Sequence, residues 1–332
     1  MKNLAIIGAG SWGTALAIAL APRFQRIRLW VYEPDLAIRI QQTRVNDVYL
    51  PGFEVPGSVE PVDHLDEALD GAEIVLSVVP SHLTRSIYQQ MVPYLSADMI
   101  FVSATKGVEN GSLLRMSELI CSLLAPHFLA RVAVVSGPTF AREVAAGEPT
   151  ALVAASDQPG VASEVQSAFS GPVFRLYTSS DPIGVEIGGS IKNVVAIGAG
   201  VLHGLGLGHN AMAALITRGL AEITRLAVAM GGLPRTLAGL AGLGDLVLTC
   251  NGELSRNRTV GVELAKGRSL EEIVASMKMV AEGVKTTDAA VELAKRYGIE
   301  MPIASKMYQL LHHGISPRDA IRSLMERSLK DE

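Results

Sequence analysis

The stretch LAIIGAGSWGTALAIALA, residues 4–21, decides the fold. A secretory signal peptide needs an unbroken apolar core, and three glycines and a serine interrupt this one. The alternative is a buried strand over 4–7, then Gly8-x-Gly10-x-x-Gly13 and a helix over 14–20, an arrangement that binds the phosphates of a dinucleotide. Gly8 then permits the tight turn, Gly10 lets a pyrophosphate approach the backbone, and Gly13 lets the helix pack on the strand. We therefore interpret the stretch as a dinucleotide site and reject the signal peptide.

A second apolar run over 27–31 predicts the next strand, which ends at Tyr32 and Glu33. Glu33 lies about 20 residues beyond the glycines, where this fold places an acid that binds the adenosine ribose. The strand, turn, helix and second strand together predict a Rossmann-type domain.

Length and composition limit the class of protein. A chain of 332 residues exceeds the usual size of a single core, so we expect two domains. The formal net charge of -4 gives no general attraction to nucleic acid or to an anionic membrane, and we expect no integral membrane segment. Cys121 and Cys250 lie far apart, outside any metal-ligand pattern, and we expect free thiols in the core or lining a pocket. The compartment is then reducing, the location cytoplasmic, and no metal is needed.

The order of apolar runs along the chain indicates the topology. Further runs predict buried strands over 73–79, 99–103, 132–135, 150–154 and 173–177. Strands that alternate with helices are typical of a doubly wound parallel sheet, which binds ligands at the carboxyl ends of its strands. Polar clusters follow three of these strands, so we expect one crevice lined by residues 80–82, 104–107 and 136–139.

Helical periodicity replaces the strand pattern after residue 180. Residues 211–230, for example, carry their apolar side chains on one helical face. The fold class is therefore α/β, with a dinucleotide-binding Rossmann-type domain over 1–180. An all-helical substrate and catalytic domain covers 181–332, and we expect the active site between the two.

Two lysines and a carboxylate are candidates for the chemistry. Lys106 follows a strand. Lys192 lies among small and apolar residues where we expect a helix to start. Such a lysine either extends to solvent or, when buried near another cation, has a lowered pKa and is a general acid near neutral pH. Asp245, between glycine and apolar residues, is either a helix cap or a site carboxylate. The sequence Ser-Arg-Asn at 255–257 is either an anion cradle or a solvated helix end.

These pieces together resemble one family. The motifs Gly8-Ala-Gly-Ser-Trp-Gly-Thr-Ala15, Ala104-Thr-Lys-Gly107, Ser136-Gly-Pro-Thr-Phe140, Lys192-Asn193, Gly242-Leu-Gly-Asp245 and Ser255-Arg-Asn257 occur in the order of bacterial-type NAD(P)-dependent glycerol-3-phosphate dehydrogenases. The resemblance extends from Leu4 to about Lys330. It implies an oxidoreductase that interconverts dihydroxyacetone phosphate and sn-glycerol 3-phosphate by hydride transfer and so supplies phospholipid synthesis. It also implies a small-molecule substrate and a homodimer.

The resemblance assigns roles residue by residue. Lys192 is the catalytic residue. The substrate-binding residues are Lys106, Gly137, Thr139, Lys192, Asn193, Asp245, Ser255, Arg256 and Asn257. The cofactor-binding residues are Gly8, Gly10, Ser11, Trp12, Gly13, Tyr32, Glu33, Lys106, Ala141, Arg256, Val280 and Glu282.

The implied mechanism needs a proton on the carbonyl oxygen. Lys192 as ammonium supplies it, with Asn193 and Asp245 orienting the lysine or the substrate hydroxyl. The cofactor is NAD(H) or NADP(H): Glu33 favours NADH, yet relatives with an acid there also use NADPH, and the preference stays open.

Two alternatives remain, one another enzyme and the other from a different class of protein. A 6-phosphogluconate-type β-hydroxyacid dehydrogenase shares the layout, but its lysine motif resembles Lys-x-x-x-Asn, whereas Asn193 here follows Lys192 directly. A non-catalytic dinucleotide sensor needs neither the buried lysine nor the phosphate cradle.

Overall fold

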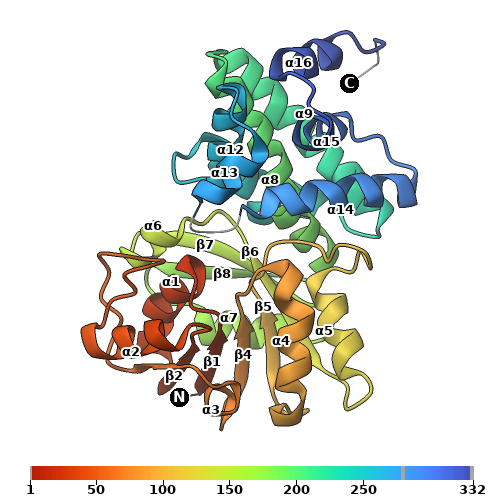
Figure 1. The fold of residues 1–332 in the computed structure, drawn as a ribbon. Coiled ribbons are helices and arrows are strands. Elements are labelled where there is room, and N and C mark those ends of the chain that lie inside the picture. Colours follow the sequence, from red (N-terminus) through yellow and green to blue (C-terminus); the bar gives the residue numbers. More distant parts are fainter. Residues whose placement is uncertain (1, 278–280, 330–332) are drawn as a thin grey trace.

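The computed structural model describes residues 2–277 and 281–329, and an eight-stranded sheet forms its first half (Figure 1). The strand order is β3-β2-β1-β4-β5-β6-β7-β8, and the order reverses beside β1, as in a Rossmann fold. The strands are β1 Asn3–Ile7, β2 Arg26–Trp30, β3 Val59–Val62, β4 Ile74–Ser77, β5 Ile100–Ser103, β6 Arg131–Ser136, β7 Thr150–Ala155 and β8 Phe174–Ser179.

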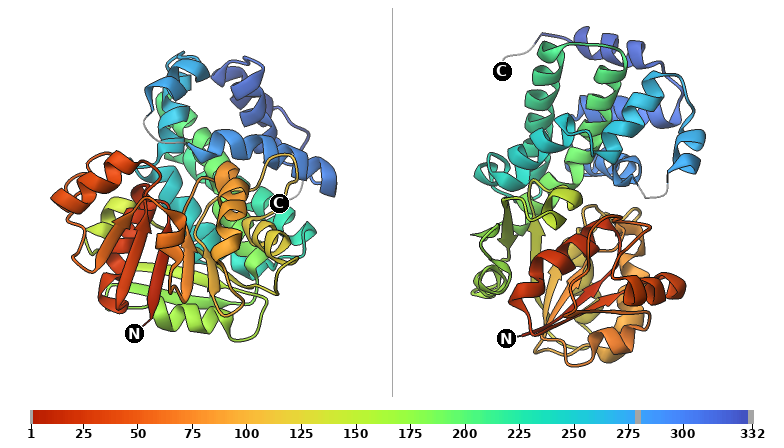
Figure 2. Two further views of the ribbon diagram at one scale, coloured as in Figure 1. Left: turned by 60° about the horizontal axis from the view of Figure 1, so that its bottom comes forward. Right: turned by 90° about the vertical axis from the view of Figure 1, so that its left-hand side faces the viewer.

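Helices flank the sheet and then form the whole second half of the described chain. Those of the sheet domain are α1 Ser11–Leu20, α2 Pro34–Thr43, α3 Leu65–Leu69, α4 Thr84–Met91, α5 Met116–Leu124, α6 Ala141–Ala145 and α7 Val161–Phe169, with short turns η1 Ala21–Arg23, η2 Ser81–Leu83 and η3 Val92–Tyr94. Those of the helical domain are α8 Pro182–Gly204, α9 His209–Ala229, α10 Pro234–Leu237, η4 Leu240–Gly244, α11 Asp245–Asn251, α12 Arg256–Ala265, α13 Leu270–Ser276, α14 Glu282–Tyr297, α15 Pro302–His312 and α16 Pro317–Met325. The expected fold class is confirmed, and Figure 2 shows the two parts stacked on each other.

The sheet differs from the expectation in two places. Strand β3 was not predicted, because its four residues include Glu60 and Pro61, and proline is tolerated there only because β3 is an edge strand. Strand β7 runs antiparallel to β6, and β8 follows β7, so the sheet is not wholly parallel. The connection from β6 contains only the five-residue helix α6, and the chain turns back into β7 without a crossover to the other edge.

Helix α8 is the core of the helical domain. Its buried residues run from Gly184 to Leu202, and α9, α11, α12 and α14 pack around it. By length and composition α8 is apolar enough to span a membrane, but its apolar window is wholly buried inside the fold. Lys192 therefore lies in the middle of a long buried helix, and the expectation that it stands at a helix start is wrong.

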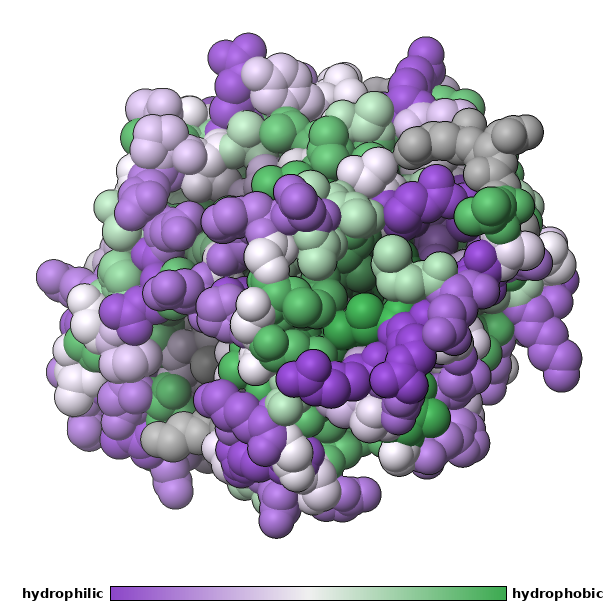
Figure 3. Space-filling model, turned by 90° about the horizontal axis from the view of Figure 1, so that it is seen from above, coloured by the Kyte–Doolittle hydropathy of each residue, from purple (hydrophilic) through white to green (hydrophobic). Residues whose placement is uncertain are grey.

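The surface of the helical domain has an apolar region at the end far from the sheet. Figure 3 shows apolar side chains gathered around a hollow there, with hydrophilic side chains surrounding them. Helix α9 has the predicted amphipathic face, with Leu215, Ile216 and Leu220 packed on the helical core.

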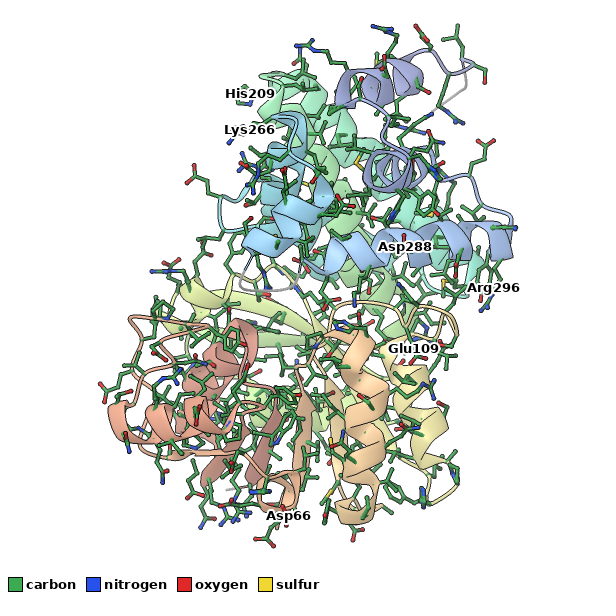
Figure 4. All side chains as sticks on the ribbon, in the orientation of Figure 1. Asp66, Glu109, His209, Lys266, Asp288 and Arg296 are labelled. Carbon is green, nitrogen blue, oxygen red and sulfur yellow. The ribbon has the colours of Figure 1, made fainter. Side chains whose placement is uncertain are left out.

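Ion pairs and hydrogen bonds join the two domains. Arg115, which precedes α5, forms a buried ion pair with Glu186 of α8. Nearer the surface, Arg296 of α14 donates to the carbonyl of Ser112, on the side of the boundary where Glu109 lies (Figure 4). The domain boundary is thus fixed on the side away from the glycine turn.

Candidate active site

The glycine turn has the geometry that the sequence predicts. Gly8 has φ +114°, in the region that favours glycine. A Cβ on Gly13 would lie 1.8 Å from the carbonyl oxygen of Gly8, so α1 packs directly on the turn. A Cβ on Gly10 would meet nothing within 4 Å, which leaves an open face at the point where α1 begins with Ser11. The turn is thus shaped for an anion at a helix N-terminus.

Other predicted cofactor residues belong to several different elements. The Nε1 atom of Trp12 is buried and has no hydrogen-bond partner among the described residues. Glu33 precedes α2 at the end of β2, and Tyr32 beside it is 76% exposed. Ala141 begins α6, which packs on α1. Val280 lies outside the described residues.

One buried carboxylate joins the two candidate lysines. Asp245, at the start of α11, is fully buried, and its Oδ2 accepts a hydrogen bond of 2.9 Å from Nζ of Lys106. Its Oδ1 accepts from Nζ of Lys192. Lys106 comes from the end of β5 and Lys192 from α8, so this cluster forms only where the two domains meet. Asp245 therefore pairs with two lysines, and Gly244, not Asp245, is the N-cap of α11.

The environment of Lys192 lowers the pKa of its ammonium. Burial is the main cause, since a charged group loses its hydration there, and the positive charge of Lys106 acts in the same direction. The charge of Asp245 opposes both effects. Lys192 is therefore held near a carboxylate but remains easier to deprotonate than a lysine in water.

Thr249, which no sequence motif indicated, also holds Lys192. Nζ of Lys192 donates to Oγ1 of Thr249 over 2.7 Å, and that hydroxyl lies 2.6 Å from the backbone oxygen of Asp245. Among the described residues, Lys192 is thus bonded to Asp245 and Thr249. The substrate hydroxyl is then the group that Asn193 is expected to orient. Thr249 lies four residues after Asp245, one turn along a helix, and this spacing was the available signal.

Lys106 also contacts the turn that follows β6. Its Nζ lies 3.3 Å from the carbonyl oxygen of Gly137 and 3.4 Å from Oγ1 of Thr139. The predicted substrate residues of the sheet domain therefore lie beside the buried carboxylate.

The Ser-Arg-Asn sequence begins α12. Ser255 is its N-cap and accepts from the backbone N–H of Arg258, while Oδ1 of Asn257 accepts from the N–H of Gly283. These bonds use acceptor oxygens, whereas a phosphate needs donors, and the Ser255 hydroxyl hydrogen and the Asn257 NH₂ are donors. Arg256 is exposed to solvent. Neighbouring residues nevertheless remove part of the hydration of its guanidinium, and this desolvation lowers its pKa.

Glu282 faces Arg256 from the start of α14. Its Oε2 accepts from the hydroxyl of Ser81, which follows β4, over 2.9 Å. Burial raises the pKa of Glu282, and Ser81 and Arg256 oppose that rise. Glu282 therefore connects the helical domain to the carboxyl edge of the sheet.

Comparison with known proteins agrees with this geometry. The family model for the NAD-dependent glycerol-3-phosphate dehydrogenase N-terminus matches residues 3–162, and the model for the C-terminus matches residues 181–322. The chain belongs to this family. A glycerol-3-phosphate dehydrogenase [NAD(P)+] of Koribacter versatilis is 59% identical over 98% of both chains, and one of Syntrophotalea carbinolica is 52% identical over 99% of both. The crystal structure of glycerol-3-phosphate dehydrogenase from Coxiella burnetii is 41% identical, with a TM-score of 0.93 over 98% of this chain and 99% of that one.

The residues of this glycerol-3-phosphate dehydrogenase family member fit a nicotinamide dinucleotide. The open face at Gly10 admits a pyrophosphate, and the orphaned indole N–H of Trp12 is a donor at the same turn. Glu33 offers a carboxylate at the end of β2 for the ribose.

Proposed function

We propose that the protein interconverts dihydroxyacetone phosphate and sn-glycerol 3-phosphate with NADH or NADPH. The observation that carries the proposal is the buried Asp245, which binds Lys106 from one domain and Lys192 from the other. In the proposed reaction the two lysines would stabilise the negative charge that develops on the carbonyl oxygen. Membership of the glycerol-3-phosphate dehydrogenase family supports the same reaction.

Each residue of the site has a separate task in this reaction. The bound reduced nicotinamide supplies a hydride to the ketone carbon. Lys192, as ammonium, polarises the carbonyl oxygen and then protonates it; in the oxidative direction its neutral amine takes the proton from the hydroxyl. Asp245 and Thr249 fix the position of its Nζ. Arg256 and the donors at the start of α12 hold the phosphate.

A spectrophotometric assay tests the proposal and its alternatives. Pure protein is mixed with dihydroxyacetone phosphate and either reduced dinucleotide, and the absorbance of the reduced nicotinamide is followed. We expect it to fall with at least one dinucleotide. Oxidation of 6-phosphogluconate with NADP⁺, and no reaction with dihydroxyacetone phosphate, would support the β-hydroxyacid dehydrogenase alternative. Dinucleotide binding without turnover on either substrate would support the sensor.

We also propose a cytoplasmic location and a role in supplying glycerol 3-phosphate for phospholipids. Cys121 and Cys250 are both free thiols, which is typical of a reducing compartment. Cys250 lies in the helical core as expected, whereas Cys121 is exposed on α5 and the expectation of a core or pocket position is wrong for it. Cell fractionation tests the location. Depletion of the protein should slow phospholipid synthesis, and added glycerol 3-phosphate should restore it.

We propose a homodimer that forms through the helical domain. The apolar region in Figure 3 supports this, as do Met325 and Leu329, large apolar side chains that are 80% and 100% exposed. Analytical ultracentrifugation tests the proposal, and a monomer at micromolar concentration would contradict it.

A further inference from the structure

Tyr49 holds the carboxylate of Glu33, the residue that the sequence predicts to bind the ribose. The hydroxyl of Tyr49 donates to Oε1 of Glu33 over 2.6 Å. Glu33 ends the segment after β2, and Tyr49 lies in the loop that follows α2. A bond to one carboxylate oxygen fixes the orientation of the group and leaves Oε2 to accept from another donor.

Tyr49 is in turn fixed to the glycine turn. Its backbone N–H donates to Oδ1 of Asn46 over 3.0 Å. Asn46 is fully buried, and its Nδ2 lies 2.8 Å from both the carbonyl oxygen of Ala9 and Oγ1 of Thr14. The phosphate-binding turn and the acid at the ribose site are thus connected through one short loop.

A carboxylate repels a 2′-phosphate unless a nearby cation neutralises it. Arg39 and Arg44 are the only basic residues between 33 and 49. Arg39 pairs with Asp47, and the guanidinium of Arg44 donates to the carbonyl oxygens of Val55 and Val59. Each therefore has another partner.

The phenol keeps its proton over the range in which enzymes work. The hydrogen bond to Glu33, burial and the charge of Glu33 together raise the pKa of Tyr49 to about 12. Tyr49 therefore acts as a constant donor, and Glu33 remains an oriented acceptor.

We propose that Tyr49 is a specificity-determining residue that acts through Glu33. By holding the carboxylate toward the ribose site, it favours the free 2′-hydroxyl of NADH and disfavours the 2′-phosphate of NADPH. This inference rests on the proposed function, because it needs a dinucleotide on the glycine turn. Tyr49 is a positioning residue and takes no part in the hydride or proton transfer.

The test measures dissociation constants of NADH and NADPH by calorimetry, without substrate. Wild type should bind NADH more tightly. Tyr49→Phe keeps the ring and removes the hydroxyl, and the ratio Kd(NADPH)/Kd(NADH) should fall by about 3- to 10-fold, the scale of one oriented hydrogen bond. Glu33→Gln should lower the ratio at least as much, and adding Tyr49→Phe to Glu33→Gln should change it no further. Tyr94→Phe, at an exposed tyrosine in η3, is the matched control and should leave the ratio unchanged.

The possible failures are distinguishable. If Tyr49→Phe weakens both dinucleotides equally, or lowers the ratio equally with Glu33→Gln present, Tyr49 does not act through Glu33 and the inference is overturned. A misfolded Tyr49→Phe variant would show in its thermal unfolding, and Tyr49→Leu, measured with and without Glu33→Gln, would then take its place under the same criteria. If wild type binds neither dinucleotide, the proposed function itself fails, and the inference with it.

Discussion

Nζ of Lys106 lies 2.9 Å from Oδ2 of Asp245, and this ion pair connects the sheet domain to the helical domain inside the site. Asp245 is fully buried and binds Lys192 through its other oxygen. One negative charge therefore serves two cations, and the cluster retains positive charge for an anionic substrate. Separation of the domains would take Lys106 away from Asp245 and leave Lys192 as the partner of that carboxylate.

The two directions of the reaction should have opposite pH dependence. Burial and the charge of Lys106 lower the pKa of Lys192, so the ammonium is lost at a lower pH than for a free lysine. The reduction needs the ammonium, and its kcat should fall as the pH rises through that pKa. The oxidation needs the neutral amine, and its kcat should fall as the pH drops. Lys106→Met removes the neighbouring cation and should move both limbs to higher pH. If Lys106→Met leaves both limbs of the pH profiles of kcat in place, Lys106 does not lower the pKa of Lys192.

Thr249→Val should reduce turnover without abolishing it. The substitution keeps the shape of the side chain but removes the acceptor that lies 2.7 Å from Nζ of Lys192. Loss of one such hydrogen bond corresponds to roughly a 3- to 30-fold fall in kcat. Thr259→Val, on the water-accessible surface of α12, is the matched control. Equal effects of the two substitutions on kcat would mean that Thr249 does not position the lysine.

Arg256→Ala should weaken recognition of the phosphate. Loss of a charge-assisted contact of this kind costs about 2–4 kcal/mol, or roughly 30- to 700-fold in kcat/KM for dihydroxyacetone phosphate. Most of the loss should appear in KM. Dihydroxyacetone lacks the phosphate, and its kcat/KM should change much less. The same loss with both substrates would make Arg256 a cofactor or structural residue.

Glu222 should give the stability of the protein a dependence on pH. Its carboxylate accepts from the N–H groups of Ile303 and Ala304 at the start of α15, and burial raises its pKa to about 7. A raised pKa means that the folded state binds the proton more tightly, so this contribution is present below the unfolded pKa and is lost as the pH rises toward 7. Its size is on the order of 2 kcal/mol. Chemical denaturation should show the free energy of unfolding of wild type falling relative to Glu222→Gln between pH 5 and pH 8. If the free energies of unfolding of the two proteins changed with pH in parallel, Glu222 would not be the source of the pH dependence.

Features that depend on residues close together in the chain could be predicted from the sequence. The glycine turn was predictable because Gly8 and Gly13 each meet a steric demand of adjacent backbone. Lys192 stood out because an apolar helix rarely carries a lysine without a partner. The partner itself required the fold, since Asp245 and Lys106 approach each other only when two domains meet. The reversal at β7 and the bond from Tyr49 to Glu33 likewise depend on tertiary contacts that no short pattern encodes.

In the proposed reaction, Lys192 supplies the proton to the substrate oxygen. The most direct measurement compares Lys192→Met with wild type for kcat of dihydroxyacetone phosphate reduction and for Kd of the reduced dinucleotide. We predict that kcat falls by about two to four orders of magnitude, the usual scale for loss of a general acid, while the Kd remains close to that of wild type. A kcat within about threefold of wild type, below the scale of any general acid, would contradict the account.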